Sequence, residues 1–254
     1  MNFNLPFIPE RPDKPRHSGL TMVMDKGLSL REAEDFCDVS SEYVDLVKLG
    51  FGTGLLTPKL KEKIKLYQQA GLKPYFGGTL FEAFIARDMF DDFRKFITES
   101  GVGMAEVSDG VLPIEHGRKC QYIETLSKDF VVLSEVGTKL KGKEISNEEW
   151  VSWMQTELQA GAWKVIAEAR ESGNIGIYNE DGSANFNLIL DIRKQLNADQ
   201  ILWEAPLKSQ QVWFIKLLGP NVNLGNIAEN EVIPLETLRR GLRGDTLLSF
   251  LPCR

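Results

Sequence analysis

Charged and polar residues interrupt the apolar runs of this chain at regular places. A charge inside an apolar strand is costly unless it is paired, bound to a metal or open to water. These positions are therefore the first candidates for a functional site. They are Asp25, Lys26, Lys48, Glu106, Glu135, Glu168, Arg170, Glu204, Asn223 and Asn226.

Carboxylates dominate this set, and histidine and cysteine are absent from it. Oxygen ligands without nitrogen or sulfur suit a hard cation such as Mg2+. The chain has only two histidines, His17 and His116, and neither lies at a short spacing from a nucleophile, which disfavours zinc and a catalytic triad. The alternative is that the four glutamates are buried ion-pair partners of Lys48 and Arg170.

The cations indicate a small, multiply charged anion, such as a phosphorylated carboxylate, as substrate. They are Lys26, Lys48, Lys139 and Arg170. A rival use for Lys48 is a Schiff base, since burial in an apolar strand favours a neutral amine. Glycine-rich corners at 50–53, 77–79 and 172–173 could present N–H groups to phosphate, or serve only as tight turns.

Eight apolar runs, recurring about every 30 residues, predict the strands that position these groups. They are Leu20–Met24, Val44–Leu49, Lys73–Phe76, Met104–Val107, Phe130–Ser134, Trp163–Ala167, Gln200–Trp203 and Val222–Leu224. Helical spacing fills the gaps, over 60–69, 89–98, 150–160 and 207–218. Ser29 with Glu32, and Ser146 with Glu149, have the spacing of a capping box at a helix start.

This alternation predicts an α/β fold, a single (β/α)8 TIM barrel over 18–250 preceded by an arm at 1–17. An open doubly wound sheet is the alternative, but the first strand is followed by no phosphate-binding glycine motif. In a barrel the strand ends converge at one mouth. The period of two places Glu168 with Arg170 on one face, and Glu106 with Ser108. Segment 174–186 predicts a hairpin, either a lid or a surface decoration.

Composition excludes several classes of protein. A net charge of −6 argues against a nucleic-acid or acidic-membrane surface. Three cysteines at distant positions form neither a disulfide framework nor a zinc site, and no segment is apolar enough for a signal peptide or a membrane span. We expect a cytoplasmic protein.

Several motifs together resemble the phosphosulfolactate synthase family, from about residue 18 to 246. They are Asp25-Lys26-Gly27, Val47-Lys48-Leu49-Gly50-Phe51-Gly52-Thr53, Gly77-Gly78-Thr79-Leu80-Phe81-Glu82, Glu135-Val136-Gly137, Arg170-Glu171-Ser172-Gly173, Glu204-Ala205-Pro206, Lys208-Ser209-Gln210-Gln211, Asn221-Val222-Asn223-Leu224 and the run from Glu236 to Thr246. One departure is Val111-Leu112-Pro113, which is less polar than the corresponding loop of archaeal members.

The resemblance implies a lyase that adds sulfite to phosphoenolpyruvate through a Mg2+-stabilised enediolate intermediate. It implies catalytic roles for Lys139, which follows Glu-Val-Gly by two residues, and for Lys48 and Glu168. We assign Asp25, Glu106 and Glu135 to the metal, with Glu168 nearby. The substrate set is Lys26, Arg170, Ser172, Gly173, Lys208, Ser209 and Asn223. The family's plant heat-stress branch leaves a non-catalytic role open. A related enzyme that adds another nucleophile to phosphoenolpyruvate is a further alternative. A homo-oligomer is also left open.

Overall fold

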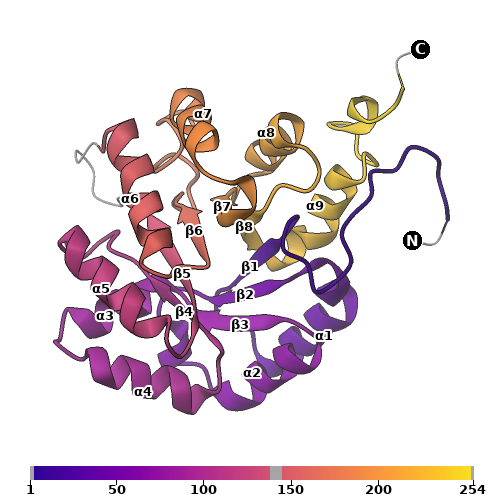
Figure 1. The fold of residues 1–254 in the computed structure, drawn as a ribbon. Helices are drawn as coiled ribbons and strands as arrows, with labels where there is room; N and C mark the ends of the chain where they lie inside the picture. Colours follow the sequence, from indigo (N-terminus) through magenta and orange to yellow (C-terminus); the bar gives the residue numbers. More distant parts are fainter. Residues whose placement is uncertain (1–2, 138–144, 253–254) are drawn as a thin grey trace.

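The computed structural model describes residues 3–137 and 145–252, and its strands form one parallel sheet that curves into a nearly closed barrel (Figure 1). The strands are β1 Thr21–Asp25, β2 Leu46–Leu49, β3 Lys73–Phe76, β4 Met104–Val107, β5 Val131–Val136, β6 Lys164–Ala167, β7 Ile201–Glu204 and β8 Leu224–Ala228.

The strand order is β3-β2-β1-β8-β7-β6-β5-β4, so the first strand pairs with the last. In that pairing Thr21 lies opposite Leu224 and Met24 opposite Ala228. An open doubly wound sheet would leave both outer strands as unpaired edges far apart, whereas β3 and β4 here meet at the remaining seam. The fold is a single (β/α)8 TIM barrel, as predicted.

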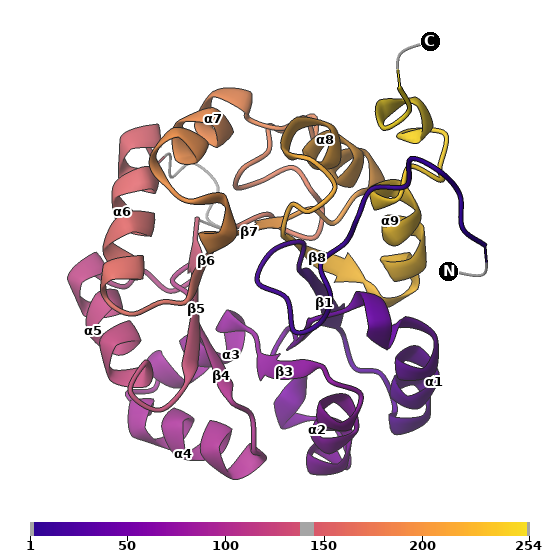
Figure 2. The same ribbon diagram turned by 45° about the vertical axis from the view of Figure 1, so that its right-hand side comes forward.

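Helices surround the barrel on its outside (Figures 1 and 2). They are α1 Leu30–Ser40, α2 Leu60–Gln69, α3 Gly78–Ile85, α4 Phe90–Ser100, α5 His116–Leu126, α6 Asn147–Gln159, α7 Phe186–Gln195, α8 Lys208–Leu218 and α9 Val232–Arg239. Short 3-10 turns lie at Ser41–Tyr43, Thr53–Leu55, Ala198–Gln200, Glu229–Glu231 and Leu247–Ser249.

Both predicted capping boxes form. The Ser29 hydroxyl accepts from the Glu32 amide, and the Glu32 carboxylate accepts in return from the Ser29 amide, at the start of α1. Ser146 and Glu149 repeat this exchange at the start of α6. Each box satisfies two amides that a helix start leaves without an intrahelical acceptor, and so defines where the preceding loop must end.

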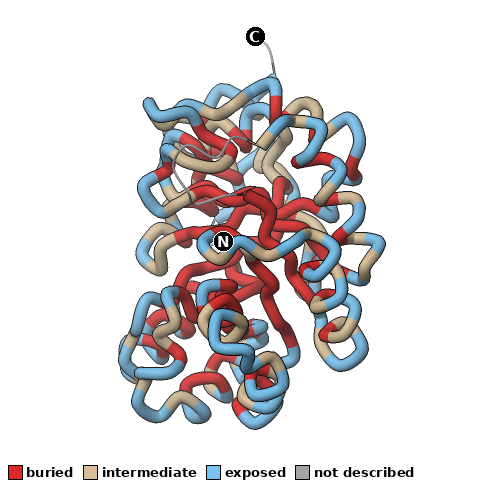
Figure 3. Tube along the Cα trace, turned by 90° about the vertical axis from the view of Figure 1, so that its left-hand side faces the viewer, coloured by how far each residue is buried: buried red, intermediate tan, exposed pale blue. Residues whose placement is uncertain are grey.

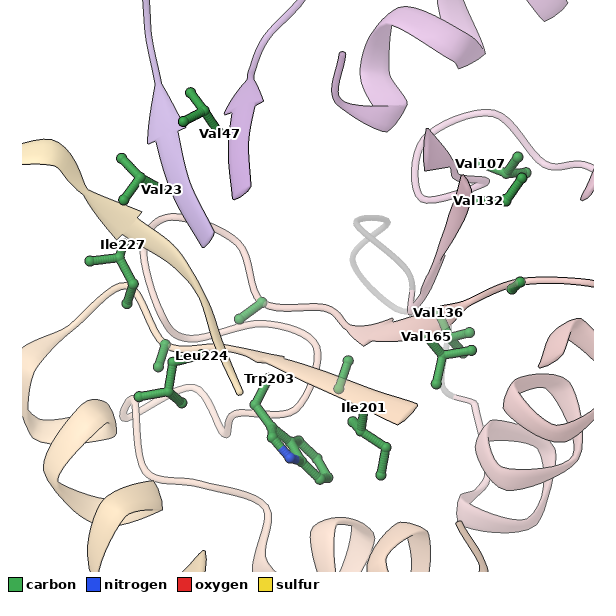
Figure 4. Packing of buried hydrophobic residues seen from close by; sticks show 14 of the residues in the cluster. Val23, Val47, Val107, Val132, Val136, Val165, Ile201, Trp203, Leu224 and Ile227 are labelled. Atoms are coloured by element: carbon green, nitrogen blue, oxygen red, sulfur yellow. The ribbon is translucent and has the colours of Figure 1, made fainter. Parts of the chain in front are cut away.

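Alternation along the strands divides the core into two regions. Side chains such as Val23, Val47, Ile201 and Trp203 project away from the barrel and pack beneath the helices (Figure 4). The alternate positions fill the barrel with a separate apolar cluster. Its members are Met22, Leu46, Tyr75, Met104, Leu133, Ile166 and Leu202. The strands are consequently buried on both faces (Figure 3).

Two segments extend this frame. Residues 3–20 form neither helix nor strand, and Arg16 binds Asp45 at 2.8 Å just before β2, so this segment lies against the amino end of the barrel (Figure 2). After β6, antiparallel bridges join Ala169 to Gly176 and Tyr178 to Ala184, which confirms a hairpin-like turn within 174–186. Among the described residues, no helix is long and apolar enough to cross a membrane.

Candidate active site at the strand carboxyl ends

A buried lysine sits among three carboxylates at the carboxyl ends of the strands. Lys48 Nζ lies 2.9 Å from Glu106 Oε1, 3.1 Å from Glu135 Oε2 and 3.5 Å from Glu204 Oε1. These residues come from β2, β4, β5 and β7, and each occupies an inward position one step beyond the apolar cluster in the barrel. The charged layer therefore rests directly on the barrel core.

Three glutamates of this layer could hold one metal ion. Carboxylate oxygens of Glu135, Glu168 and Glu204 all lie within 4.8 Å of one another, and all three residues are buried. They come from β5, from the residue after β6 and from the end of β7, which are neighbouring strands. Three hard oxygen donors at this separation suit Mg2+ and disfavour softer metals.

The triad opens into a cavity of about 310 Å³. Its charged walls are Lys48, Glu135, Glu168, Arg170, Glu171 and Glu204, and its polar walls are Thr79, Ser172 and Asn226. Gly50, Phe51 and Gly77 bring backbone from two of the predicted glycine corners to the same space. The cavity has the size of a small-molecule site and combines cations with carboxylates.

Electrostatics keep Lys48 charged. Burial alone would lower the pKa of its ammonium group, but Glu106, Glu135 and Glu204 more than offset this effect and raise the pKa well above its usual value. Burial in turn raises the pKa of Glu106, although Lys48 opposes that shift. A charged ammonium is no nucleophile, so the Schiff-base use of Lys48 is disfavoured.

Further buried groups support the charged layer from outside. Ser108 Oγ lies 2.7 Å from Glu82 Oε1 and 2.9 Å from Glu135 Oε1. The second oxygen of Glu82 accepts from the amides of Val111 and Leu112. Glu82 thereby ties the loop after β4 to α3.

Gly78 is required by the packing at this point. Its amide donates to Glu106 Oε1 at 2.5 Å, and a Cβ added to Gly78 would lie 2.3 Å from the Ser108 Cβ. Any side chain there would push the start of α3 away from Glu106. The glycine pair after β3 thus serves close approach to the charged layer.

Most of the predicted strand-end residues meet here. Lys48, Glu135, Glu168, Arg170 and Ser172 line the cavity, and Glu106 adjoins it through Lys48. Lys26 lies at the rim, where its ammonium pairs with Glu171, a cavity residue from the loop after β6. The pair joins the loops that follow β1 and β6.

Asp25 does not join the metal-capable group, contrary to its assignment. It is an outward position of β1, because Met22 and Met24 occupy the inward ones. Its carboxylate binds Lys63 Nζ at 2.6 Å and accepts from Tyr67 Oη at 2.9 Å, both on α2. Glu106 also lies outside this group, whereas Glu135 and Glu168, both expected near the metal, belong to it together with Glu204.

Asn223 lies at the wrong end of the barrel for a substrate contact. It precedes β8, which begins two residues later than predicted. Its side chain accepts from the Leu20 amide at 3.0 Å and donates to the Ile201 carbonyl at 3.0 Å. Asn223 therefore joins the amino ends of the strands.

Other predicted contacts lie beside the cavity or outside the described residues. Lys208 pairs with Asp245 at 2.8 Å, and neither it nor Ser209 is a wall residue. Gly173, with a left-handed φ of 67°, is held by Gln210, which donates to its carbonyl at 2.7 Å. Lys139 falls in 138–144, outside the described residues, so its role stays a prediction.

Sequence reasoning gave no role to two residues that the structure places beside the charged layer. Glu82 and Tyr75 lie in α3 and on β3, where an ordinary buried helix and strand were expected. Asn226, a predicted strand-end candidate, lines the cavity, has a left-handed φ of 57° and donates to the Ala169 carbonyl at 3.2 Å. Asparagine tolerates this conformation better than most residues.

Comparison with known proteins agrees with this geometry. A family model for (2R)-phospho-3-sulfolactate synthase matches residues 9–245. The chain belongs to the phosphosulfolactate synthase family. It is 44% identical over 245 residues to the phosphosulfolactate synthase of Methanothermobacter thermautotrophicus, covering 94% of this chain and 95% of that protein. It is 42% identical over 243 residues to the Bacillus subtilis phosphosulfolactate synthase, covering 94% of this chain and 96% of that protein.

More distant matches set this family membership in context. The Arabidopsis thaliana protein heat-stress-associated 32 is 22% identical over 264 residues, covering 91% of this chain and 88% of that protein. The solved structure of 3-hexulose-6-phosphate synthase from Salmonella typhimurium covers 88% of this chain and 100% of its own, with a TM-score of 0.55 and 14% identity. That structure supports the barrel fold alone.

Proposed function

We propose that this protein is a phosphosulfolactate synthase that adds sulfite to the methylene carbon of phosphoenolpyruvate. The observation that carries the proposal is the strand-end cavity, which places the triad Glu135, Glu168 and Glu204 against the cations Lys48 and Arg170. Membership of the family, at 44% identity to a named synthase, supports this substrate pair over other small anions.

The charged layer fits a divalent cation. The carboxylate oxygens of three of its buried glutamates lie within 4.8 Å of one another, and hard oxygen donors at this separation suit Mg2+. Glu135, Glu168 and Glu204 would hold Mg2+, while Glu106 stays with Lys48. When bound, Mg2+ supplies positive charge beside the carboxylate of the substrate.

The cations of the cavity would hold and orient the anionic substrates. Arg170 presents a planar fork of donors suited to carboxylate or phosphate. Thr79 and Ser172 line the same space with hydroxyl groups that can reach phosphate oxygens, whereas the amides of Gly50 and Gly77 already donate to the carbonyls of Asp25 and Leu49. Lys26, exposed at the rim beside Glu171, would meet an entering anion first.

The reaction needs little activation of the nucleophile, because sulfite is nucleophilic near neutral pH. Its sulfur lone pair forms the C–S bond at the methylene carbon, and the π electrons move toward C2 and the carboxylate. The fixed charge of Lys48 would stabilise that negative charge without reorganisation. A proton then reaches C2, and the phosphate ester is kept. We propose Lys139 as the group that stabilises or protonates this intermediate.

Incubation with phosphoenolpyruvate, sulfite and Mg2+, followed by mass spectrometry, tests the proposal. The expected result is phosphosulfolactate from the wild type and a large loss of rate in Lys139→Ala. Absence of product with all three components would contradict the synthase and favour a non-catalytic role. Full turnover by Lys139→Ala would contradict the role of this lysine alone.

A further inference from the structure

A second cavity, of about 450 Å³, lies at the opposite end of the barrel from the strand-end cavity. Its walls come from the N-terminal arm, from the residues before β2 and from the start of β3, with Trp163 just before β6. Lys14, Arg16 and Lys73 supply its basic groups, and Glu42 and Asp45 its acidic ones. We infer that this amino-end cavity binds a small anion that carries a phosphate or sulfonate group. The inference is independent of the proposed reaction.

The acidic groups of the cavity do not balance all of its basic groups. Both oxygens of Asp45 are engaged, one by Arg16 at 2.8 Å and the other by the Thr21 amide at 2.9 Å. Glu42 is exposed at the rim and forms no ion pair among the described residues. Asp45 therefore balances Arg16, and no buried carboxylate of the described chain balances the nearby lysines.

The lysines are held by neutral groups instead. Lys14 Nζ donates to the carbonyls of Ser41, at 2.9 Å, and Val44, at 2.5 Å. The ammonium of Lys73 lies 5.5 Å from the centre of the Trp163 ring, and that of Lys164 lies 4.5 Å from it. Lys164 also donates to the carbonyls of His17 and Asp199. Three ammonium groups thus surround one end of the barrel without a carboxylate partner in the described residues.

The ammonium groups of Lys14 and Lys73 keep N–H donors that a ligand could use. An ammonium has three N–H groups, and Lys14 uses two of them on carbonyls. The Lys73 side chain makes no hydrogen bond or ion pair within the described part of the chain. A tetrahedral oxyanion accepts several such charge-assisted bonds at once, whereas an apolar ligand would leave them unused.

Burial disfavours the charged form of two lysines at this end of the barrel, as their lowered pKa values indicate. Burial lowers the pKa of Lys164 to about 8; Asp199 opposes that shift and the charge of Lys73 adds to it. Burial likewise lowers the pKa of Lys14; Asp45 opposes this and Arg16 adds to it. A bound anion would favour the charged form of both lysines.

The indole N–H signal of Trp163 gives a local probe, because Trp163 lies at the amino end and the strand-end cavity at the other. Its signal in a ¹H–¹⁵N spectrum is assigned with Trp163→Phe. Inorganic phosphate, and in a second arm inorganic sulfate, is titrated into the whole protein with ionic strength held constant by NaCl. The expected result is a saturable shift of this signal in either arm or both.

Variants decide whether the cavity causes the shift. Lys73→Gln removes an exposed ammonium that forms no hydrogen bond or ion pair among the described residues, and should raise the dissociation constant by about tenfold. Lys14→Gln should do the same. Lys61→Gln, which removes an exposed charge on α2, should leave it unchanged. A shift that does not saturate, or one with equal affinity in Lys73→Gln, would overturn the inference.

Discussion

Lys48 and Glu106 form an ion pair of 2.9 Å inside the barrel, with the Glu106 side chain fully buried. The pair joins β2 to β4 across the barrel interior, since these strands are not neighbours in the sheet. The same ammonium also faces Glu135 and Glu204, so one cation contacts three buried carboxylates.

Replacing this cation should destabilise the fold in a pH-dependent way. Lys48→Met leaves buried carboxylates without their ammonium, at a cost of about 3–5 kcal/mol near pH 8. Without the ammonium that opposes it, burial would raise the pKa of Glu106 further, so Glu106 takes up a proton as pH falls and the loss shrinks toward pH 5. Urea unfolding at both pH values measures this, with Lys61→Met as the control. An equal loss at both would contradict it.

Metal binding should depend on the triad. Glu168→Gln removes one of three carboxylates and should weaken Mg2+ binding by more than about tenfold in calorimetric titration. Glu124→Gln, an exposed change on α5, should leave binding as in the wild type. If both variants bind Mg2+ equally well, the triad is not the site.

Asp25 should matter for stability and not for the metal. Asp25→Asn leaves the buried ammonium of Lys63 without its carboxylate, which should lower the free energy of unfolding by about 3 kcal/mol. The Mg2+ affinity of the folded variant should be unchanged. Exposed Asp35→Asn should alter neither quantity. Loss of Mg2+ binding in Asp25→Asn would restore the original assignment of this residue.

Lys164 should make stability rise with pH in the alkaline range. Its folded pKa of about 8 lies below the ordinary value of 10.5, so between these values the unfolded chain binds more protons. Stability from this group therefore increases as pH rises from 8 toward 10. Urea unfolding at pH 7.5, 8.5 and 9.5 measures this. The free energy of unfolding of the wild type should rise with pH relative to that of Lys164→Met. Parallel curves would contradict the shifted pKa.

The fold was predictable because its signals are local. The strands Lys73–Phe76 and Met104–Val107 and the helix Leu60–Gln69 were predicted to the residue, since apolar periodicity and flanking turns mark them. Strand β8 was placed too early, over 222–224. The observed strand, Leu224–Ala228, contains Gly225 and Asn226, which are weak strand formers. The apolar pattern therefore ended the predicted strand at Leu224.

The site was predictable where it follows alternation along a strand. Glu168 and Arg170 face the same cavity, and Ser108 lies inward with Glu106, as the period of two predicted. Asp25 was misassigned because its charge type was weighed above its register, which places it outward beside α2. The support from Glu82 depends on contacts between distant segments that no local pattern carries.

Carbon NMR of the reaction tests the central claim most directly. Phosphoenolpyruvate labelled with ¹³C at the methylene carbon is mixed with the protein, Mg2+ and sulfite. The signal should move from the alkene region to that of a saturated carbon bonded to sulfur, only when sulfite is present, and far more slowly with Glu168→Gln than with Glu124→Gln. A methylene signal that stays in the alkene region with the wild-type protein would contradict the synthase activity.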